Sequence, residues 1–271
     1  APGSLYLSEN TLMASMPGVP YEMKKMMELT VIPAIKKKFS LPFIVNKYFY
    51  TAGVGETILS DALTNFEENI PENFSLAYLP SVGKVRLRLT GRGNNLNKLE
   101  QVAETSSKEI QEAIDKYIYS TTEISFETVL GEMLRERNLS IGSAESCTGG
   151  YISHLLTEIP GASDYFKGSI VSYSNEIKES ILGVKFETLK THGAVSEATV
   201  SEMLSGAIKQ LNVDIAIAVS GVAGPGGGST EKPVGCVFIG IANQQNQYIK
   251  RLQFTNNRER NIQLSAITAF V

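Results

Sequence analysis

The sequence is poor in histidine and cysteine, the two residue types that most often build metal sites and reactive dyads. It contains 2 histidines, His154 and His192, and 2 cysteines, Cys147 and Cys236. Neither histidine lies beside a convincing nucleophile motif, so we expect no Ser-His-Asp triad and no multi-histidine metal site. The cysteines lack C-x-x-C spacing, which indicates neither a disulfide framework nor a zinc site and favours a reducing cytoplasm.

Long apolar runs and an excess of one charge are also missing. No stretch approaches the roughly 20 apolar residues that a membrane span needs, and the N-terminus lacks the pattern of a signal peptide. Lys and Arg number 25 against 28 Asp and Glu, and the pI is about 5.6. This is not the electrostatic footprint of a dedicated nucleic-acid binder. We expect a soluble cytoplasmic protein that acts on small molecules, with no membrane association and no nucleic-acid partner.

The N-terminal residues look like part of something larger. The chain begins Ala1-Pro2-Gly3 without a methionine, and residues 1–40 hold too little pattern for a domain, so we interpret the chain as a fragment of a longer protein. A short strand from Leu12 and a helix from about Pro20 are predicted there. We assign the methionines of that helix to its core: Met23, Met26 and Met27.

Residues 41–119 predict a small α+β domain, followed by a linker at residues 120–124. Strands are expected at residues 47–51, 75–79 and 84–90, with helices at 56–68 and 95–117. The last strand alternates between an apolar face and a basic face. The apolar face carries Val85, Leu87 and Leu89, and the basic face carries Lys84, Arg86 and Arg88. Arg86, Arg88 and Arg92 could contact nucleic acid, although a charged strand face is more often simply solvated.

From residue 125 onward, helices alternate with short β-branched strands. This order predicts a three-layer α/β/α sheet with helices on both faces. Strands are expected at residues 140–144, 169–173, 215–220, 235–242 and 248–254. Helices are expected at residues 126–137, 149–158, 175–182, 196–211 and from about 258. Ligands collect beyond the carboxyl ends of the strands in such sheets, and the conspicuous motif loops fall there.

The first motif is AESCTGG, Ala144–Gly150, where a strand ends and a helix begins. A hydroxyl at such a turn is exposed, and helix-start N–H groups can stabilise an oxyanion. From this segment alone, Ser146 is equally a nucleophile or a helix cap, and Thr148 can also cap. Glu145 could polarise or position a reacting group, or it could be an ordinary surface carboxylate.

A serine nucleophile needs a base, and with histidine nearly absent the candidate is a lysine held neutral. Tyr173 is expected to end a strand, and Lys178 falls about one and a half turns along the following helix. Taken alone, Lys178 would be an exposed helix lysine. Together with Tyr173, Asn175 and the Ser146 turn it becomes a catalytic candidate, because desolvation can bring a lysine pKa to roughly 7 or 8.

The third motif, Ser220–Ser229, is a glycine-rich loop after an apolar strand. Its free backbone N–H groups can wrap an anion or approach a planar ring. A flexible hairpin is the alternative, but the long glycine run and the return at Lys232–Gly235 favour a ligand loop. Arg258, at the start of the last helix, either clamps a phosphate or forms a local ion pair.

These segments together resemble the C-terminal domain of the CinA family of nicotinamide-nucleotide amidases. The resemblance runs over residues 125–271 and rests on five motifs in order: AESCTGG, YSNEIK, HGAVSE, SGVAGPGGGS and EKPVG. Upstream, LPSVGKVRLRL is similar to the small middle domain of that family. MPGVPYEMKKM looks like the last part of its molybdopterin-binding-like nucleotide domain, which would make residues 1–40 a remnant of that domain.

The resemblance implies a reaction and a set of roles. The reaction is hydrolysis of the carboxamide of nicotinamide mononucleotide to nicotinate mononucleotide and ammonia, in pyridine nucleotide salvage. Ser146 would be the nucleophile, Lys178 the general base and Tyr173 a hydrogen-bonding partner. The implied substrate contacts are Glu145, Thr148, Gly149, Asn175, Ser220, Gly221, Gly224, Gly226 and Arg258. No metal or other cofactor is implied, and we expect a homodimer.

Two departures from the family pattern bear on substrate affinity. The loop before Arg258 reads Thr255-Asn256-Asn257 where relatives commonly show a glycine and an acid, and Ile262 stands where many have a second arginine. The alternative hypothesis is therefore a degenerate module, linked to competence or DNA damage, that binds a nucleotide or a partner without turnover. The intact Ser-Tyr-Lys set argues against it. With most of the N-terminal nucleotide domain missing, we do not expect the ADP-ribose pyrophosphatase activity that the family can carry.

Overall fold

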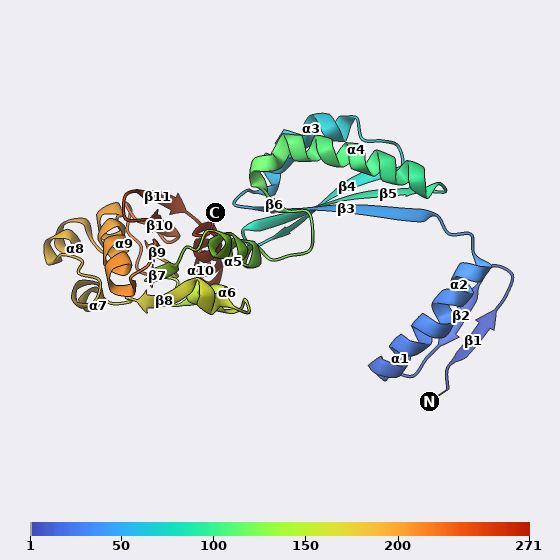
Figure 1. Cartoon of the computed structure of the whole chain (residues 1–271), viewed down its shortest axis with the longest axis horizontal. Coiled ribbons are helices and arrows are strands. Elements are labelled where there is room, and N and C mark those ends of the chain that lie inside the picture. Colours follow the sequence, from blue (N-terminus) through green and yellow to red (C-terminus); the bar gives the residue numbers. More distant parts are fainter. Residues whose placement is uncertain (1) are drawn as a thin grey trace.

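The computed structural model describes residues 2–271 and shows three groups of elements in chain order (Figure 1). We call them the N-terminal segment (residues 2–42), the middle unit (43–120) and the C-terminal unit (126–271). The first residue of the predicted 1–40 segment lies outside the described residues. No helix in residues 2–271 combines the length and apolarity needed to span a membrane.

The N-terminal segment is a hairpin beside a helical stretch. Its elements are β1 (Ser4–Leu7), β2 (Leu12–Ser15), α1 (Pro20–Met26), a π-helical turn (Met27–Val31) and α2 (Ile32–Lys38). The two strands pair antiparallel. Within this segment only Val31 is buried, and Met23 is 38% exposed, so our assignment of Met23 to a helix core is wrong. Met26 and Met27 are half-buried.

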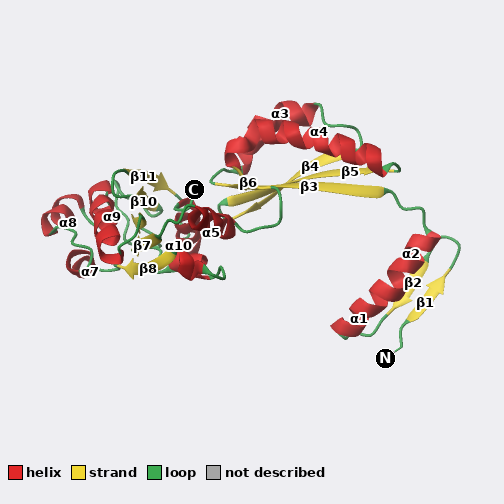
Figure 2. Ribbon diagram, in the orientation of Figure 1, coloured by secondary structure: helices red, strands yellow, loops and turns green. Residues whose placement is uncertain are grey.

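The middle unit is a four-stranded antiparallel sheet in the order β4-β5-β3-β6, with two helices on one face (Figure 2). Its elements are β3 (Phe43–Ala52), α3 (Glu56–Glu68), β4 (Phe74–Ser81), β5 (Lys84–Gly93), α4 (Leu96–Ile114), a 3₁₀ turn (Asp115–Tyr117) and β6 (Ile118–Ser120). Val85, Leu87 and Leu89 of β5 are at most 4% exposed and lie in the core beneath the helices. The basic residues of β5 therefore point to the face that no helix covers.

Strand β6 corrects the sequence prediction, which placed Ser120 in a linker. Three residues give too short a pattern to recognise, and the strand forms by pairing with β3, where Tyr50 lies opposite Ser120. Tyr50 and Ser120 are far apart in the sequence, so a local sequence pattern does not predict their pairing.

The C-terminal unit is built on a five-stranded sheet in the order β11-β10-β9-β7-β8. Its strands are β7 (Ile141–Glu145), β8 (Phe166–Val171), β9 (Ile215–Gly221), β10 (Cys236–Ala242) and β11 (Gln247–Gln253). Its helices are α5 (Phe126–Glu136), α6 (Tyr151–Thr157), a 3₁₀ turn (Ala162–Asp164), α7 (Asn175–Ser180), α8 (Phe186–His192), α9 (Glu197–Leu211) and α10 (Arg258–Thr268). β8, β7 and β9 run parallel, while β10 and β11 continue the sheet antiparallel.

Alternation along the central strands divides this unit into two apolar cores. Ile217 and Val219 of β9 belong to the core that includes residues of α5, α6 and α10. Ala216 and Ala218 belong to the opposite core, which includes residues of α9. All four side chains are at most 1% exposed. Helices therefore cover both faces of the sheet, and the predicted α/β/α architecture is confirmed.

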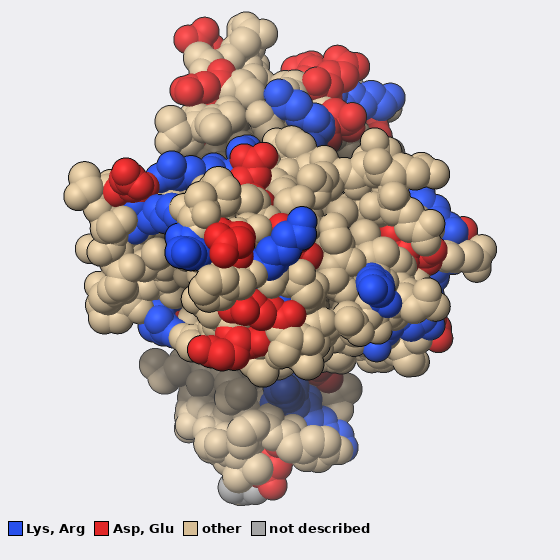
Figure 3. All heavy atoms as spheres, turned by 90° about the vertical axis from the view of Figure 1, so that its left-hand side faces the viewer, with Lys and Arg blue, Asp and Glu red and all other residues tan. Residues whose placement is uncertain are grey.

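The middle and C-terminal units meet at the β4–β5 turn. A Cβ added at Gly83 in this turn would lie 2.8 Å from Cγ2 of Ile267 in α10, so the backbone lies directly against that helix. Beside it, Lys84 Nζ lies 2.7 Å from Oε1 of Glu127 in α5, and Glu127 is buried. An end-on view from the C-terminal unit shows positive and negative side chains interspersed rather than a patch of one sign (Figure 3).

Candidate active site

The candidate site lies at the carboxyl edge of the parallel strands. β7 is the central strand of the parallel set, so the turn after Glu145 lies beside the ends of β8 and β9. Ser146 follows β7 directly, Ser172 follows β8, and Ser220 is near the end of β9. Ser172 N donates to Glu145 O at 2.8 Å and Ser146 N donates to Val219 O at 3.0 Å. The three motif loops therefore meet where the sequence pattern predicts a ligand site.

A buried serine–lysine pair stands at the centre of this edge. Lys178 Nζ lies 3.0 Å from Ser146 Oγ and donates to the Ser172 carbonyl oxygen at 2.6 Å. Lys178 is 1% exposed and Ser146 is 8% exposed. The alternative interpretation of Lys178 as an exposed helix lysine is therefore wrong.

The short helix α7 explains how a lysine comes to be buried here. Ser174 Oγ accepts from Ile177 N and caps the helix, and one turn later Lys178 points inward. Val184 N donates to Lys178 O at 3.0 Å, which folds the following segment back over the helix. A Cβ added at Gly206 in α9 would lie 2.0 Å from Leu182 O, so α9 packs tightly behind that segment. Backbone close packing thus holds Lys178 against the sheet edge.

No carboxylate within the described residues forms an ion pair with Lys178. Burial therefore acts on its charge without a carboxylate to offset it, and desolvation, the largest cause, lowers the pKa of Lys178 below its usual value. A lysine in this state is neutral for more of the time near neutral pH. That is the property a general base requires.

The turn after Ser146 offers hydrogen-bond donors. The Ser146 amide is already bonded to Val219 O, whereas in the described structure neither the Cys147 nor the Thr148 amide donates a hydrogen bond. Thr148 Oγ1 is also buried without a partner. Free amides preceding a helix are the usual donors to an oxyanion that forms on an adjacent nucleophile.

Cys147 is the other nucleophile in this turn, and its surroundings disfavour it. It is 7% exposed and packs in the apolar core with Ile152 and Leu155. Burial raises the pKa of the Cys147 thiol to about 12, so almost none is thiolate at neutral pH. The hydroxyl beside Lys178 is the better-placed group.

Glu145 is neither a surface carboxylate nor free to contact a substrate, so both of those sequence interpretations are wrong. Its side chain is 0% exposed. Its oxygens accept from the amides of Gly150 at 2.9 Å, Ile152 at 3.1 Å and Ser153 at 2.9 Å. They also accept from three serine hydroxyls, those of Ser143, Ser153 and Ser169. Glu145 therefore caps the start of α6 and fixes the turn that carries Ser146.

We expect Glu145→Gln to destabilise the C-terminal unit by about 3 kcal/mol, because the amide removes the charge that these donors stabilise and adds donors where acceptors are needed. Glu132→Gln on the exposed side of α5 is the matched control and should change the free energy of unfolding by less than about 0.5 kcal/mol. Denaturant unfolding measures both. Equal stability of the two variants would contradict a capping role.

Tyr173 and Arg258 form a second contact group at the same edge. Arg258 Nη2 donates to Tyr173 Oη at 3.0 Å, and its Nη1 donates to Gly224 O at 2.7 Å. The arginine thus links the loop after β8, the glycine-rich loop and the start of α10. Tyr173 is 62% exposed, and β8 ends at Val171, so the prediction that Tyr173 ends the strand is wrong by two residues.

Two predicted substrate contacts serve the protein's own packing. Ser220 is 1% exposed and its Oγ donates to Ala194 O at 2.7 Å, which ties β9 to the loop before α9. A Cβ added at Gly221 would lie 2.6 Å from Val237 Cγ2, so this glycine permits close pairing of β9 and β10. The Ser220 hydroxyl is therefore not available to a ligand, and Gly221 serves the pairing of the strands.

Of the remaining predicted contacts, Gly149, Gly226 and Asn175 border open space, whereas Gly224 packs against Val234 and Thr148 is buried. Gly149 has a φ of 61°. A Cβ added at Gly149 or at Gly226 would have no neighbouring atom within 4 Å. Gly224 has φ of 93° and accepts the Arg258 bond through its carbonyl. Asn175 is exposed at the start of α7. These residues leave room beside the serine turn for a ligand to approach the backbone.

Sequence reasoning missed two positioning groups, the Ser172 carbonyl and the Asn261 side chain. Asn261 is 1% exposed, accepts from Thr255 N at 2.9 Å and donates to Ala223 O at 3.0 Å. It therefore anchors the glycine-rich loop to α10. A backbone carbonyl leaves no trace in a sequence. A polar residue on the apolar side of the last helix was the available signal for Asn261.

Two of the residues near Arg258 that depart from the family pattern, Asn257 and Ile262, have structural roles. Asn257 Oδ1 accepts from Arg260 N at 2.9 Å and caps α10, the helix whose first residue is Arg258. Ile262 packs against the core beneath α10. Asn256 is exposed. The arginine therefore keeps a well-formed helix start despite the altered loop.

The fold and this edge define a three-layer α/β/α protein with a buried serine–lysine pair beyond its parallel strands. The family model described as the CinA C-terminal domain matches residues 123–271, and the model described as the damage-inducible protein CinA KH domain matches residues 46–120. The chain belongs to the CinA family.

Among relatives, the chain is similar to the CinA-like protein of Cytophaga hutchinsonii, at 41% identity over 98% of this chain and 64% of that protein. It is 42% identical to the CinA-like protein of Flavobacterium psychrophilum over 96% of this chain and 62% of that protein. The chain thus spans less than two thirds of the length of either relative.

Solved structures match the C-terminal part. A CinA superfamily protein from Klebsiella pneumoniae has a TM-score of 0.52 and 35% identity, covering 53% of this chain and 90% of that one. A competence/damage-inducible protein from Agrobacterium tumefaciens has a TM-score of 0.52 and 36% identity, covering 56% of this chain and 95% of that one.

Proposed function

We propose that this protein hydrolyses the carboxamide of nicotinamide mononucleotide to nicotinate mononucleotide and ammonia, with Ser146 as nucleophile and Lys178 as general base. One observation carries the proposal: Lys178 Nζ lies 3.0 Å from Ser146 Oγ in a site that excludes solvent from the lysine. Membership of the CinA family supports a nucleotide-related substrate.

Acylation begins with neutral Lys178. Its N–H bond to the Ser172 carbonyl orients the amine so that the nitrogen lone pair can face the Ser146 hydroxyl. Lys178 takes the hydroxyl proton as Oγ forms a bond to the amide carbon. The carbonyl oxygen becomes negative, and the free amides of Cys147 and Thr148 stabilise it.

Breakdown of that intermediate uses the same proton. The Lys178 ammonium donates it to the amide nitrogen, the C–N bond breaks, and ammonia leaves an ester on Ser146. Lys178, neutral again, takes a proton from water as the water oxygen bonds to the ester carbon. Release of the Ser146 oxygen, with the proton returned to it, yields the carboxylate.

Substrate contacts are assigned to groups around the serine turn and the glycine-rich loop. Arg258 supplies a fixed positive charge whose position is set by Tyr173 and Gly224. We assign it to the anionic part of the nucleotide. The turn at Thr148 and Gly149, the exposed Asn175, and Gly226 complete the surroundings. Glu145, Ser220 and Gly221 position this frame.

Ammonia release from nicotinamide mononucleotide tests the proposal directly. We expect turnover to require the ribosyl phosphate, so nicotinamide alone should react far more slowly because it cannot use Arg258. Turnover should persist in a chelator, because both proton transfers are assigned to Lys178. Absence of ammonia release at millimolar substrate, with the chain folded, would reject the amidase and favour a binding module.

A further inference from the structure

The uncovered face of the middle unit's sheet pairs tyrosines with arginines. In the β3–β5 register Tyr48 lies opposite Arg88, and Tyr50 lies opposite Arg86. Both pairs lie on the face away from α3 and α4, because the alternate residues of β5 fill the core. Solvated sheet faces usually mix short polar groups with charges of both signs, so this row is unusual.

The tyrosine rings form a row of neighbours, here called the tyrosine platform, in which adjacent rings are tilted by 34° and 53° to one another. The ring centroids of Tyr48 and Tyr50 are 6.3 Å apart, and those of Tyr50 and Tyr119 are 6.2 Å apart. The Arg86 guanidinium lies 5.9 Å from the Tyr48 ring centroid. All three rings are half-buried, which leaves part of their surface accessible. Accessible aromatic side chains of this kind stack the planar rings of nucleic-acid bases.

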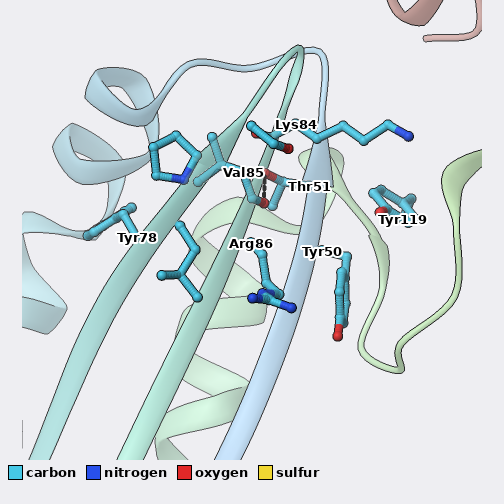
Figure 4. A pocket seen from close by; sticks show the side chains of 10 residues that line it. Tyr50, Thr51, Tyr78, Lys84, Val85, Arg86 and Tyr119 are labelled. Atoms are coloured by element: carbon cyan, nitrogen blue, oxygen red, sulfur yellow. Dashed lines mark hydrogen bonds between the residues drawn. The ribbon is translucent and has the colours of Figure 1, made fainter.

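A cavity of about 490 Å³ opens on this platform. Its lining residues are Tyr50, Thr51, Tyr78, Leu79, Pro80, Ser81, Lys84, Val85, Arg86 and Tyr119. Figure 4 shows Arg86 and Tyr50 side by side on neighbouring strands, with Tyr119 beyond them. The lining contains two cations and no carboxylate.

The positive charge of this cavity is only partly satisfied by the protein. Lys84 is paired with Glu127, but within residues 2–271 the Arg86 guanidinium has no hydrogen bond or ion pair. Next along the face, Nε of Arg88 is buried without a hydrogen-bond partner. In a chain whose net charge is -3, two arginines without an anionic partner beside half-buried rings favour an anion that also carries a planar ring.

We propose that this cavity binds a mononucleotide, with its base stacked on Tyr50 and its phosphate bonded to Arg86. The volume lies within the roughly 300–1,000 Å³ typical of small-molecule sites, which suits one nucleotide rather than a strand. Arg92, farther along β5, does not line the cavity. The site lies apart from Ser146 and Lys178 and does not depend on the proposed amidase.

The contacts of the cavity decide which residues are informative to change. Tyr119 packs edge-on against Phe126 of α5, with ring centroids 5.0 Å apart, and Lys84 bonds Glu127. Substituting either would disturb the junction with the C-terminal unit. Arg86→Gln removes the charge without touching that junction, and Tyr50→Leu removes a ring that reaches it only through Tyr119.

Calorimetric titration of the full chain with adenosine 5′-monophosphate tests the site, because this nucleotide lacks the carboxamide of the amidase substrate. We expect saturable binding that Tyr50→Leu and Arg86→Gln each weaken at least tenfold. Arg92→Gln, the same charge change on the same strand, should leave binding unchanged. Adenosine and ribose 5-phosphate should each bind at least tenfold more weakly than the nucleotide.

Three results would overturn the proposal. One is no binding at millimolar nucleotide by the folded wild-type chain. Another is loss of binding in Arg258→Gln but not in Arg86→Gln, which would place the nucleotide at the Ser146 edge. The third is much tighter binding of a single-stranded deoxythymidine decamer, weakened equally by Arg86→Gln and Arg92→Gln, which would identify the face as a nucleic-acid surface.

Discussion

Ser146→Ala is expected to reduce ammonia release from nicotinamide mononucleotide by roughly 10⁴-fold or more, the scale on which loss of a catalytic nucleophile acts. The change deletes one oxygen that lies 3.0 Å from Lys178 Nζ. Lys178 keeps its bond to the Ser172 carbonyl, so the buried amine is not left without a partner. The free energy of unfolding should therefore fall by only about 1 kcal/mol.

Ser180→Ala is the matched control for that experiment. Ser180 lies on the same short helix as Lys178, and its hydroxyl donates to Glu176 O at 2.7 Å on the exposed side. This variant should keep full turnover and differ little in denaturant unfolding. Full activity in Ser146→Ala would instead show that Ser146 is not the nucleophile.

Much of the fold could be predicted because its signals are local. The helix over residues 56–68 has apolar residues at helical spacing and was predicted with the bounds that the structure shows. The strand predicted over residues 84–90 alternates cleanly, and in the structure it continues for only a few residues more. Helix α8 (Phe186–His192) was missed, because its seven residues carry one buried apolar side chain and give no periodicity.

The direction of polar side chains was the harder part. Glu145 and Ser220 stand in motif loops next to Ser146 and Gly221, and sequence alone placed both toward a ligand. Their partners come from elsewhere in the chain: Ser169 for the carboxylate and Ala194 for the hydroxyl. Contacts of this kind are decided by how β8 and the loop before α9 pack, which periodicity does not encode.

Burial of Lys178 is a tertiary effect of the same kind. Helix α7 has six residues and exposes its other side chains, so its sequence reads as a surface helix. The lysine points inward because the chain folds back over α7 at Val184. Gly206 lets α9 pack closely against Leu182, which holds that segment in place. The sequence indicated Lys178 only through the scarcity of histidine and the neighbouring motifs.

Lys178→Arg is expected to lower turnover at least roughly 100-fold, because arginine keeps the positive charge but cannot give up its proton. Arginine must also fit a site where the lysine is 1% exposed, so some loss of stability will accompany the change. Lys185→Arg makes the same substitution at a lysine whose side chain is 79% exposed, and should preserve both turnover and stability. Calorimetric binding of nicotinate mononucleotide to the folded variant separates loss of catalysis from loss of binding.

The pH dependence of the wild-type rate completes the test of Lys178. Desolvation lowers the pKa of this lysine, and only its neutral form can accept the Ser146 proton. The rate should therefore fall as pH decreases through the lowered pKa and level off above it, at a pH below the ordinary lysine value of about 10.4. In Lys178→Arg the residual rate should lose this inflection, since the guanidinium stays protonated throughout. Wild-type turnover in Lys178→Arg, or an unchanged pH profile in a folded variant, would show that another group is the base.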